Sequence, residues 1–134
     1  MDRAWWRQYM DEVQASFRGL RITGHQKVSG VKHVKFRKCR HSGEGAIALA
    51  AQYGGARRIG LLGYDCQHTG GKKHWHGDHP KRLGNAGTVN KWADHLRTLA
   101  GELPGIEILN LTRETALAQW PRFELSRFLE GESP

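Results

Sequence analysis

The sequence predicts a single α/β domain, with a small, mostly parallel sheet covered by helices on both faces. Two short apolar runs, 58–63 and 106–111, are typical of strands buried on both faces. Segments with helical character, 42–53 and 88–103, precede them, and helices that alternate with strands favour a parallel sheet. A chain of 134 residues with 38% hydrophobic residues is long enough to bury one core, so we expect one domain.

The N-terminal part is expected to form a helix followed by two short strands. Apolar residues recur over 3–17 at spacings of three and four, which predicts one stripe of an amphipathic helix. The stripe consists of Trp6, Met10, Val13 and Phe17. Strands are predicted at 20–23 and 31–36, with Ser29 and Gly30 forming the turn between them.

The second helix, over 42–53, is rich in alanine, which indicates close packing. Ser42 is expected to cap its start, and the glycine pair at 54–55 is expected to end it.

Farther along the chain, Thr88 is expected to cap the helix over 88–103, and Thr112 a short helical turn over 113–119. A last amphipathic piece is expected over 123–129.

The apolar runs and the cysteines of the sequence indicate the cellular compartment in which the protein is expected. No apolar run approaches the roughly 18 residues of a membrane span, and the first residues lack the apolar stretch of a signal peptide. Cys39 and Cys66 stand in no CxxC pair, so they are expected to be free thiols in a reducing compartment. The sequence therefore predicts a cytoplasmic protein without membrane contact.

Positive charge is concentrated near the N-terminus. The net charge is +8, and residues 1–41 hold ten Lys and Arg against three Asp and Glu. Between 20 and 41 there are seven basic residues and no acidic one. The seven are Arg21, Lys27, Lys32, Lys35, Arg37, Lys38 and Arg40. Such a field favours nucleic acid or an acidic protein as partner, and a solvated basic face on the strand pair is the alternative.

The stretch from Tyr64 to Asn85 has no periodicity and is rich in Gly, His and Lys. A long irregular connection in a small domain is more often functional than not. Asp65 comes just past a predicted strand, where ligands of open α/β sheets collect, so it is a candidate catalytic or ligand-orienting acid. The alternative is that Asp65 only stabilises a turn.

The start of the helix at 42–45 offers unpaired N–H groups without bulky side chains, which is what gripping a phosphate requires. Ser42, Gly43 and Gly45 are therefore candidate ligand-binding residues, with ordinary helix capping as the alternative.

A histidine cluster occupies the middle of the loop, in the segment HWHGDH at 74–79. Its letters match the HxHxDH motif of the metallo-β-lactamase family, which implies zinc or manganese ligands at His74, His76, Asp78 and His79. Here ten residues separate the motif from Gly63 at the strand end, and the chain is shorter than that fold. The alternatives are that the histidines contact an organic ligand, as general acids or bases, or are polar loop residues.

The cluster is flanked by Lys72, Lys73, Lys81 and Arg82, which make the loop cationic, so an anionic small molecule is the expected ligand. The candidate ligand-binding residues of the loop are Gln67, Thr69, Lys72, Lys73 and Asn85, and its candidate catalytic histidines are His74, His76 and His79.

Several stretches together resemble a group of uncharacterised bacteriophage and prophage proteins. They are SGEG at 42–45, GYDCQ at 63–67, TGGK at 69–72, HWHGDHP at 74–80 and NLTRETAL at 110–117. The resemblance implies a phage- or prophage-encoded protein in a bacterial host. More distantly, the helix-then-strand portion resembles the bacterial sialyltransferases and the motility accessory factor and 6-hydroxymethylpterin diphosphokinase-like families.

That second resemblance implies a modified Rossmann-type sheet that binds a nucleotide-linked donor. It places Ser42 and Gly43 against the nucleotide and Asp65 at the adjacent strand end. In fuller relatives, further strands and a Gly-rich turn precede the segment like Trp5-Trp6. We therefore expect a shortened form that lacks half of the nucleotide site, or a site that is complete only in a homo-oligomer.

Three functional hypotheses follow. The leading one is binding of a nucleotide or another anionic ligand, with glycosyltransferase-like group transfer in which a loop histidine acts as base and Asp65 orients the ligand. The second is metal-dependent hydrolysis at the histidine cluster. The third is a non-enzymatic basic module that binds through residues 20–41.

Overall fold

The structure is a computed structural model, and it describes residues 3–24, 28–80 and 83–134. In chain order the helices and strands are α1 (Arg3–Ser16), β1 (Ile22–Thr23), β2 (Lys32–His33), α2 (Ser42–Ala48), the π-helix η1 (Leu49–Tyr53), β3 (Arg58–Leu61), the 3-10 turns η2 (Thr69–Gly71) and η3 (Val89–Lys91), α3 (Trp92–Gly101), β4 (Glu107–Asn110) and α4 (Leu125–Leu129). None of the helices in the described ranges has the length and apolar character needed to span a bilayer.

The strands pair in parallel, as the sequence predicts, but they form two sheets of two strands each. β3 pairs with β4, with Ile59 opposite Ile108 and Leu61 opposite Asn110. β1 pairs with β2 separately. The fold is therefore a mixed arrangement of helices and small parallel sheets.

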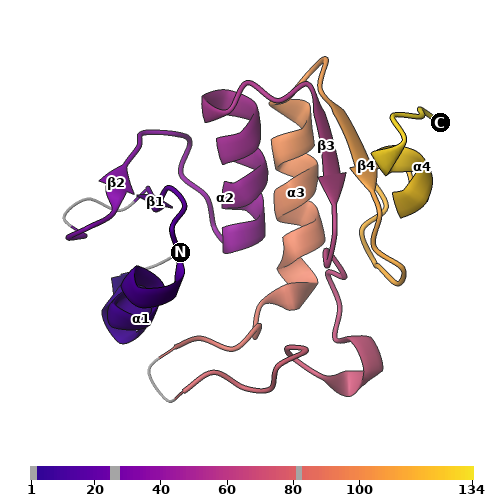
Figure 1. Cartoon of the computed structure of the whole chain (residues 1–134). Helices are drawn as coiled ribbons and strands as arrows, with labels where there is room; N and C mark the ends of the chain where they lie inside the picture. The colour runs from indigo at the N-terminus through magenta and orange to yellow at the C-terminus, as the bar shows by residue number, and fades with distance from the viewer. Residues whose placement is uncertain (1–2, 25–27, 81–82) are drawn as a thin grey trace.

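Helices lie on both faces of the β3–β4 pair (Figure 1). Leu61 faces the main core together with Leu96 and Leu99 of α3, and Ile47 of α2 joins the same cluster. On the opposite face, a Cβ built at Gly60 would lie 2.9 Å from the Phe128 ring of α4. The absence of a side chain at Gly60 therefore lets α4 approach the sheet closely.

α1 matches the predicted helix, but its apolar stripe is only partly covered. Trp6 is buried at 3% exposure, whereas Phe17, just past the end of the helix, is 50% exposed. The turn predicted before the second strand is present, because Val31 N donates to Val28 O and Gly30 has a φ of 73°. α1 and this N-terminal sheet stand to one side of the main core in Figure 1.

The predicted cap of α2 is wrong by one residue. His41 is the N-cap, and its side chain accepts a hydrogen bond from Glu44 N, while Ser42 is the first helical residue. After Ala48 the helix continues as η1 and ends at Gly54.

Two further capping predictions are also wrong. No side-chain cap is present at Thr88, whose hydroxyl accepts a hydrogen bond from the Trp92 indole instead. The short helix predicted over 113–119 is absent, and that described segment is irregular.

Candidate functional site

The fold fixes the start of the long loop through hydroxyl groups at the end of β4. Thr112 Oγ1 accepts a hydrogen bond from Tyr64 N at 3.0 Å, and Thr115 Oγ1 donates to Tyr64 O at 2.7 Å. The fully buried Asn110 accepts from Thr112 N through its side chain. Thr112 therefore does not cap a helix, because its hydroxyl is used to hold the neighbouring chain segment.

Tyr64 also joins the loop to α2. Its hydroxyl donates to Gly43 O at 3.0 Å, and burial raises the pKa of Tyr64 to about 12, so the hydroxyl keeps its proton as a donor. A Cβ at Gly43 would lie 3.0 Å from the Tyr64 ring. Gly43 is therefore a packing position against Tyr64.

Asp65 is engaged within the loop. Its carboxylate accepts a hydrogen bond from Thr69 Oγ1 at 2.6 Å, and its carbonyl accepts from Ala116 N at 2.8 Å. The next residue, Cys66, has a left-handed backbone with a φ of 51°, which is uncommon for a side-chain-bearing residue. Asp65 and Thr69 thus stabilise the turn that leads into η2, in agreement with the structural alternative for Asp65.

Neither cysteine is activated. Cys39 and Cys66 are free thiols, as predicted. Burial raises the pKa of both, to about 11 for Cys66. The thiols stay protonated at neutral pH and are poor nucleophiles or metal ligands.

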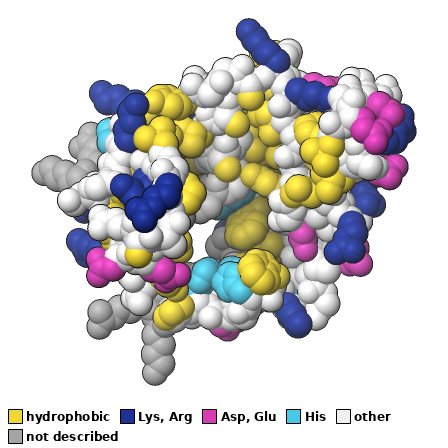
Figure 2. Space-filling model, viewed as in Figure 1, with side chains coloured by type: hydrophobic (Ala, Val, Ile, Leu, Met, Phe, Trp, Pro, Cys, Tyr) yellow, Lys and Arg dark blue, Asp and Glu magenta, His cyan; other side chains and the backbone are white. Residues whose placement is uncertain are grey.

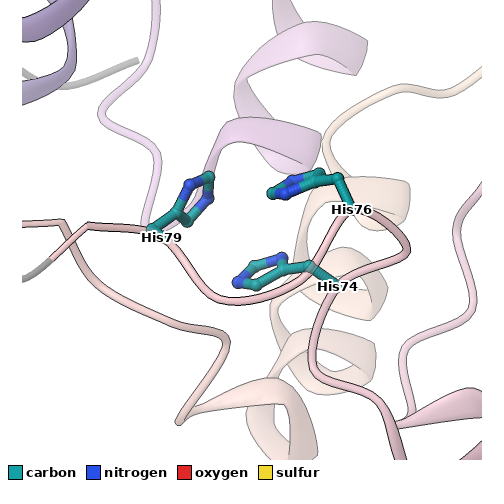
Figure 3. Close-up of side chains that lie close together, drawn as sticks. All are labelled: His74, His76 and His79. Atoms are coloured by element: carbon teal, nitrogen blue, oxygen red, sulfur yellow. The ribbon is translucent and has the colours of Figure 1, made fainter.

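The three histidines of the loop converge on one point (Figure 3). One ligand nitrogen from each of His74, His76 and His79 lies within 4.8 Å of the other two. The ring centroids are 5.2 Å apart for His74 and His76, 4.5 Å for His74 and His79, and 4.9 Å for His76 and His79. We call these three residues the histidine triad.

The triad fits a metal ion with small adjustments. Zinc–nitrogen bonds of about 2.0–2.1 Å in a tetrahedral site imply nitrogen separations of about 3.3 Å. The rings of His74 and His76 lie nearly parallel, at 10°, and would rotate to aim at a shared ion. His76 is exposed and belongs to an irregular stretch of loop, so its ring has room to turn.

His74 is prepared to act as a ligand. Its Nε2 is buried and has no hydrogen-bond partner in the structure. Burial, followed by the neighbouring imidazoles of His79 and His76, lowers the pKa of His74, which favours the neutral form that metals bind. An unpartnered buried nitrogen is costly unless something occupies it.

Asn85 supports the triad from the far end of the loop. Its side-chain oxygen accepts a hydrogen bond from His79 N at 2.7 Å, and it also makes a side-chain hydrogen bond with His74. Asn85 was predicted to contact ligand, and in the structure it holds two histidines in place.

Asp78 lies outside the triad, although the motif includes it. Its carboxylate is 60% exposed and lies 3.8 Å from Lys73 Nζ. Within the described residues, the structure therefore groups three histidines rather than three histidines and a carboxylate.

Comparison with known proteins adds no relative. No family model, curated protein or solved structure matches the chain. The resemblances to phage proteins and to sialyltransferases therefore stay expectations.

The remaining predicted ligand-binding residues fall into two places. Gln67 and Lys72 are exposed on the loop. Ser42 and Gly45 line a pocket of about 690 Å³, whose other walls come from β1, from 36–41 and from farther along α2 and η1. No residue of the loop contributes to that pocket. Lys81 and Arg82, at the far end of the loop, lie outside the described residues.

A second histidine group escaped the sequence analysis. His41, Glu44 and His95 also bring possible ligand atoms within 4.8 Å of one another. Both Arg37 and Arg40 already pair with the buried carboxylate of Glu44, and a metal ion there would meet two guanidinium charges. This group is therefore structural. It joins two separate segments, the start of α2 and the middle of α3, so the sequence gave no local signal for it.

The basic segment 20–41 is less available than its sequence indicates. Arg37 pairs with Glu44 and Glu102, Arg40 pairs with Glu44, and Arg21 donates to Gly30 O. Lys27 lies outside the described residues. Two of the seven basic residues, Arg37 and Arg40, are thus neutralised by acidic residues within the fold.

Proposed function

We propose that the protein binds a divalent transition metal ion, zinc in preference to manganese, through the histidine triad and uses it in hydrolysis. The observation that carries this proposal is the convergence of three imidazoles, one of them with a buried unpartnered nitrogen. An all-imidazole set suits zinc, whereas manganese prefers oxygen ligands.

The number of ligands supports a catalytic rather than a structural role. Structural zinc sites are closed by four protein ligands, and catalytic sites use three and leave one position open. Asp78, the obvious fourth ligand, is turned to Lys73, and His76 is exposed. Zinc in such an open site acts as a Lewis acid and lowers the pKa of a bound water toward 7.

The side chains in and around the triad have distinct roles in this proposal. His74, His76 and His79 are ligands and are not free to act as general bases. Asn85 is a positioning residue, because it contacts the backbone of His79 and the ring of His74. Asp78 is not a ligand in this proposal, and its carboxylate lies 3.8 Å from Lys73 Nζ.

The test is calorimetric titration of the chelator-treated full chain with zinc, together with elemental analysis of the purified protein. We expect one zinc per chain, a loss of affinity of about 100-fold or more in His76→Ala, and a loss of about 10–100-fold in Asn85→Ala. His68→Gln, an exposed loop histidine outside the triad, is the matched control and should bind as the parent does. Absence of stoichiometric binding, or equal binding by His76→Ala, would overturn the proposal.

A second candidate is binding of a nucleotide-linked donor in the pocket beside α2, the role that the sialyltransferase resemblance implies. The pocket volume and its lining by Lys38, Ser42 and Gly45 favour it. It ranks second because Arg37 and Arg40, which also line the pocket, are paired with Glu44. Titration with nucleotide sugars tests it, and the absence of any heat of binding removes it.

A further inference from the structure

Trp75 is the most exposed of the large hydrophobic side chains in the described residues, at 92%. It stands between two members of the triad in the sequence, and its ring meets His76 edge to face with centroids 5.4 Å apart. In Figure 2, histidines lie at the lower rim of a hollow, with a hydrophobic side chain next to them. An indole left in water beside a candidate metal site is a surface available for stacking on a flat group.

The charge around Trp75 selects the kind of flat group. Lys72 and Lys73 are both exposed and directly precede the triad, and Asp78 is the single acidic residue between them and Pro80. Two lysines and one aspartate give +1, and a divalent ion in the triad would bring the local charge to +3. A ligand with both an aromatic face and negative charge matches this surface, whereas a neutral sugar or an aliphatic carboxylate matches only half of it.

We infer that the substrate bound at this site is a phosphate ester of a nucleoside, with Trp75 stacking on the base and Lys72 attracting the phosphate. In its hydrolysis the oxygen of water would bond to phosphorus, the bond from phosphorus to the ester oxygen would break, and the leaving oxygen would take up a proton from that water. This inference rests on the proposed metal site and adds the substrate class. Stacking of a base on an aromatic side chain contributes about 1–3 kcal/mol, and phosphate contacts by lysine make binding sensitive to salt. The exposed position of His76 leaves the site open to a polymer as well as to a single nucleotide.

The experiment uses the zinc-loaded full chain and a fluorescein-labelled single-stranded oligodeoxythymidylate, with binding followed by anisotropy. Trp75→Ala should weaken binding about tenfold or more, Trp75→Phe should retain most of it, and Lys72→Ala should reduce its salt dependence. Leu129→Ala, which removes an apolar side chain exposed at 74% on α4, should leave binding unchanged.

Failure of the inference and failure of the metal site give different results. Zinc titration of Trp75→Ala should match the parent, since the substitution spares the triad. If the parent binds zinc but Trp75→Ala holds the oligonucleotide as tightly as the parent, or the parent holds none, the inference is wrong and the metal site stands. Oligonucleotide binding that persists unchanged after chelation would separate the ligand from the triad and also overturn the inference.

Competition identifies the source of the phosphate ester. Thymidine monophosphate that displaces the oligonucleotide at equal nucleotide concentration would assign a mononucleotide. Displacement by unlabelled oligonucleotide alone would assign single-stranded nucleic acid.

Discussion

The residue that joins most parts of this molecule is Glu44. Its side chain is fully buried, and its two oxygens accept hydrogen bonds from Arg37 and from both the backbone and the guanidinium of Arg40. Burial alone would raise its pKa, but these contacts outweigh burial and lower the pKa of Glu44 to about 2. A buried carboxylate shared by two arginines connects the segment before α2 to the helix itself.

Replacing Glu44 with Gln should therefore destabilise the fold. The neutral amide cannot compensate two guanidinium groups, and breaking a buried ion pair from one side costs about 3 kcal/mol or more. The measurement is urea unfolding followed by tryptophan fluorescence. Glu102→Gln is the matched control, because Glu102 also pairs with Arg37 but is 43% exposed, and its loss should cost less than about 1 kcal/mol. Equal effects of the two substitutions would contradict this account.

His41 should make the free energy of unfolding depend on pH in the acidic range. Burial lowers its pKa to about 4 from an ordinary value of 6.5, although Glu44 opposes the shift, and His95 and Arg40 add to it. The ring also stacks on Trp92 and accepts the Glu44 N–H through Nδ1. Since the folded state resists protonation of His41, stability is lost as pH falls from 6.5 through 4.

His41→Ser keeps an N-cap oxygen but cannot titrate, so it should flatten the stability curve in that window. The expected difference is about 1–2 kcal/mol between pH 6.5 and 4, below the full value of the shift because the ring stays partly in contact with water. The decline between pH 4.5 and 2 that arises from Glu44 should remain. Parallel curves for His41→Ser and the parent above pH 4 would show that His41 plays no part.

At the scale of elements, predictions that rest on local sequence patterns were confirmed in part, since only Lys32–His33 of the strand expected at 31–36 forms. The expected strands at 58–63 and 106–111 appear as β3 and β4, and the helix over 3–17 as α1. Where prediction was wrong, a distant partner decides the structure. Threonine commonly caps helices, but the hydroxyl of Thr112 instead accepts a hydrogen bond from Tyr64 N, 48 positions away in the sequence. His41 replaces Ser42 as the cap of α2 because its ring is also packed against α3.

Gly60 tests how closely α4 packs on the sheet. A Cβ there would lie 2.6 Å from Leu111 Cδ1 and 2.9 Å from the Phe128 ring, so Gly60→Ala should destabilise by about 1–2 kcal/mol. Urea unfolding measures the effect, and it should shrink in a Phe128→Ala background, where one of the two obstacles is removed. Gly101→Ala, at the end of α3 with no atom within 4 Å of the added carbon, should cost nothing. An unchanged penalty in the double variant would place the strain elsewhere.

At the scale of the whole molecule, the candidate site was predictable only as far as it is local. The histidine triad lies within six consecutive residues, so the sequence motif alone was enough to predict it. The pairing of Asp78 with Lys73, and the support from Asn85, depend on how the loop folds back. The second histidine group brings together residues as far apart as 41 and 95. The ion pairs of Arg37 and Arg40 with its carboxylate, Glu44, follow no sequence pattern.

The distribution of the core predicts that the N-terminal part opens first. The main hydrophobic cluster draws its buried residues from α2, α3, β3, β4 and the segment 117–120, together with Cys66 of the loop and Leu103 just past α3. None comes from α1, β1 or β2. α1 contributes one buried residue, Trp6, beside a pocket of about 210 Å³ that separates α1 from 28–29. Regions with few buried apolar contacts open at lower free energy than the core.

Native-state hydrogen exchange at graded urea should therefore show lower opening free energies for amides of α1 than for amides of α3. The ion pairs of Arg37 and Arg40 with Glu44 join the N-terminal segment to the core, so Glu44→Gln should lower protection of α1 more than that of α3. Glu102→Gln should leave that difference nearly unchanged, because Arg37 keeps its buried partner. If the α1 amides instead exchange only with global unfolding, the two parts form one cooperative unit, and the carboxylate of Glu44 stabilises all of it equally.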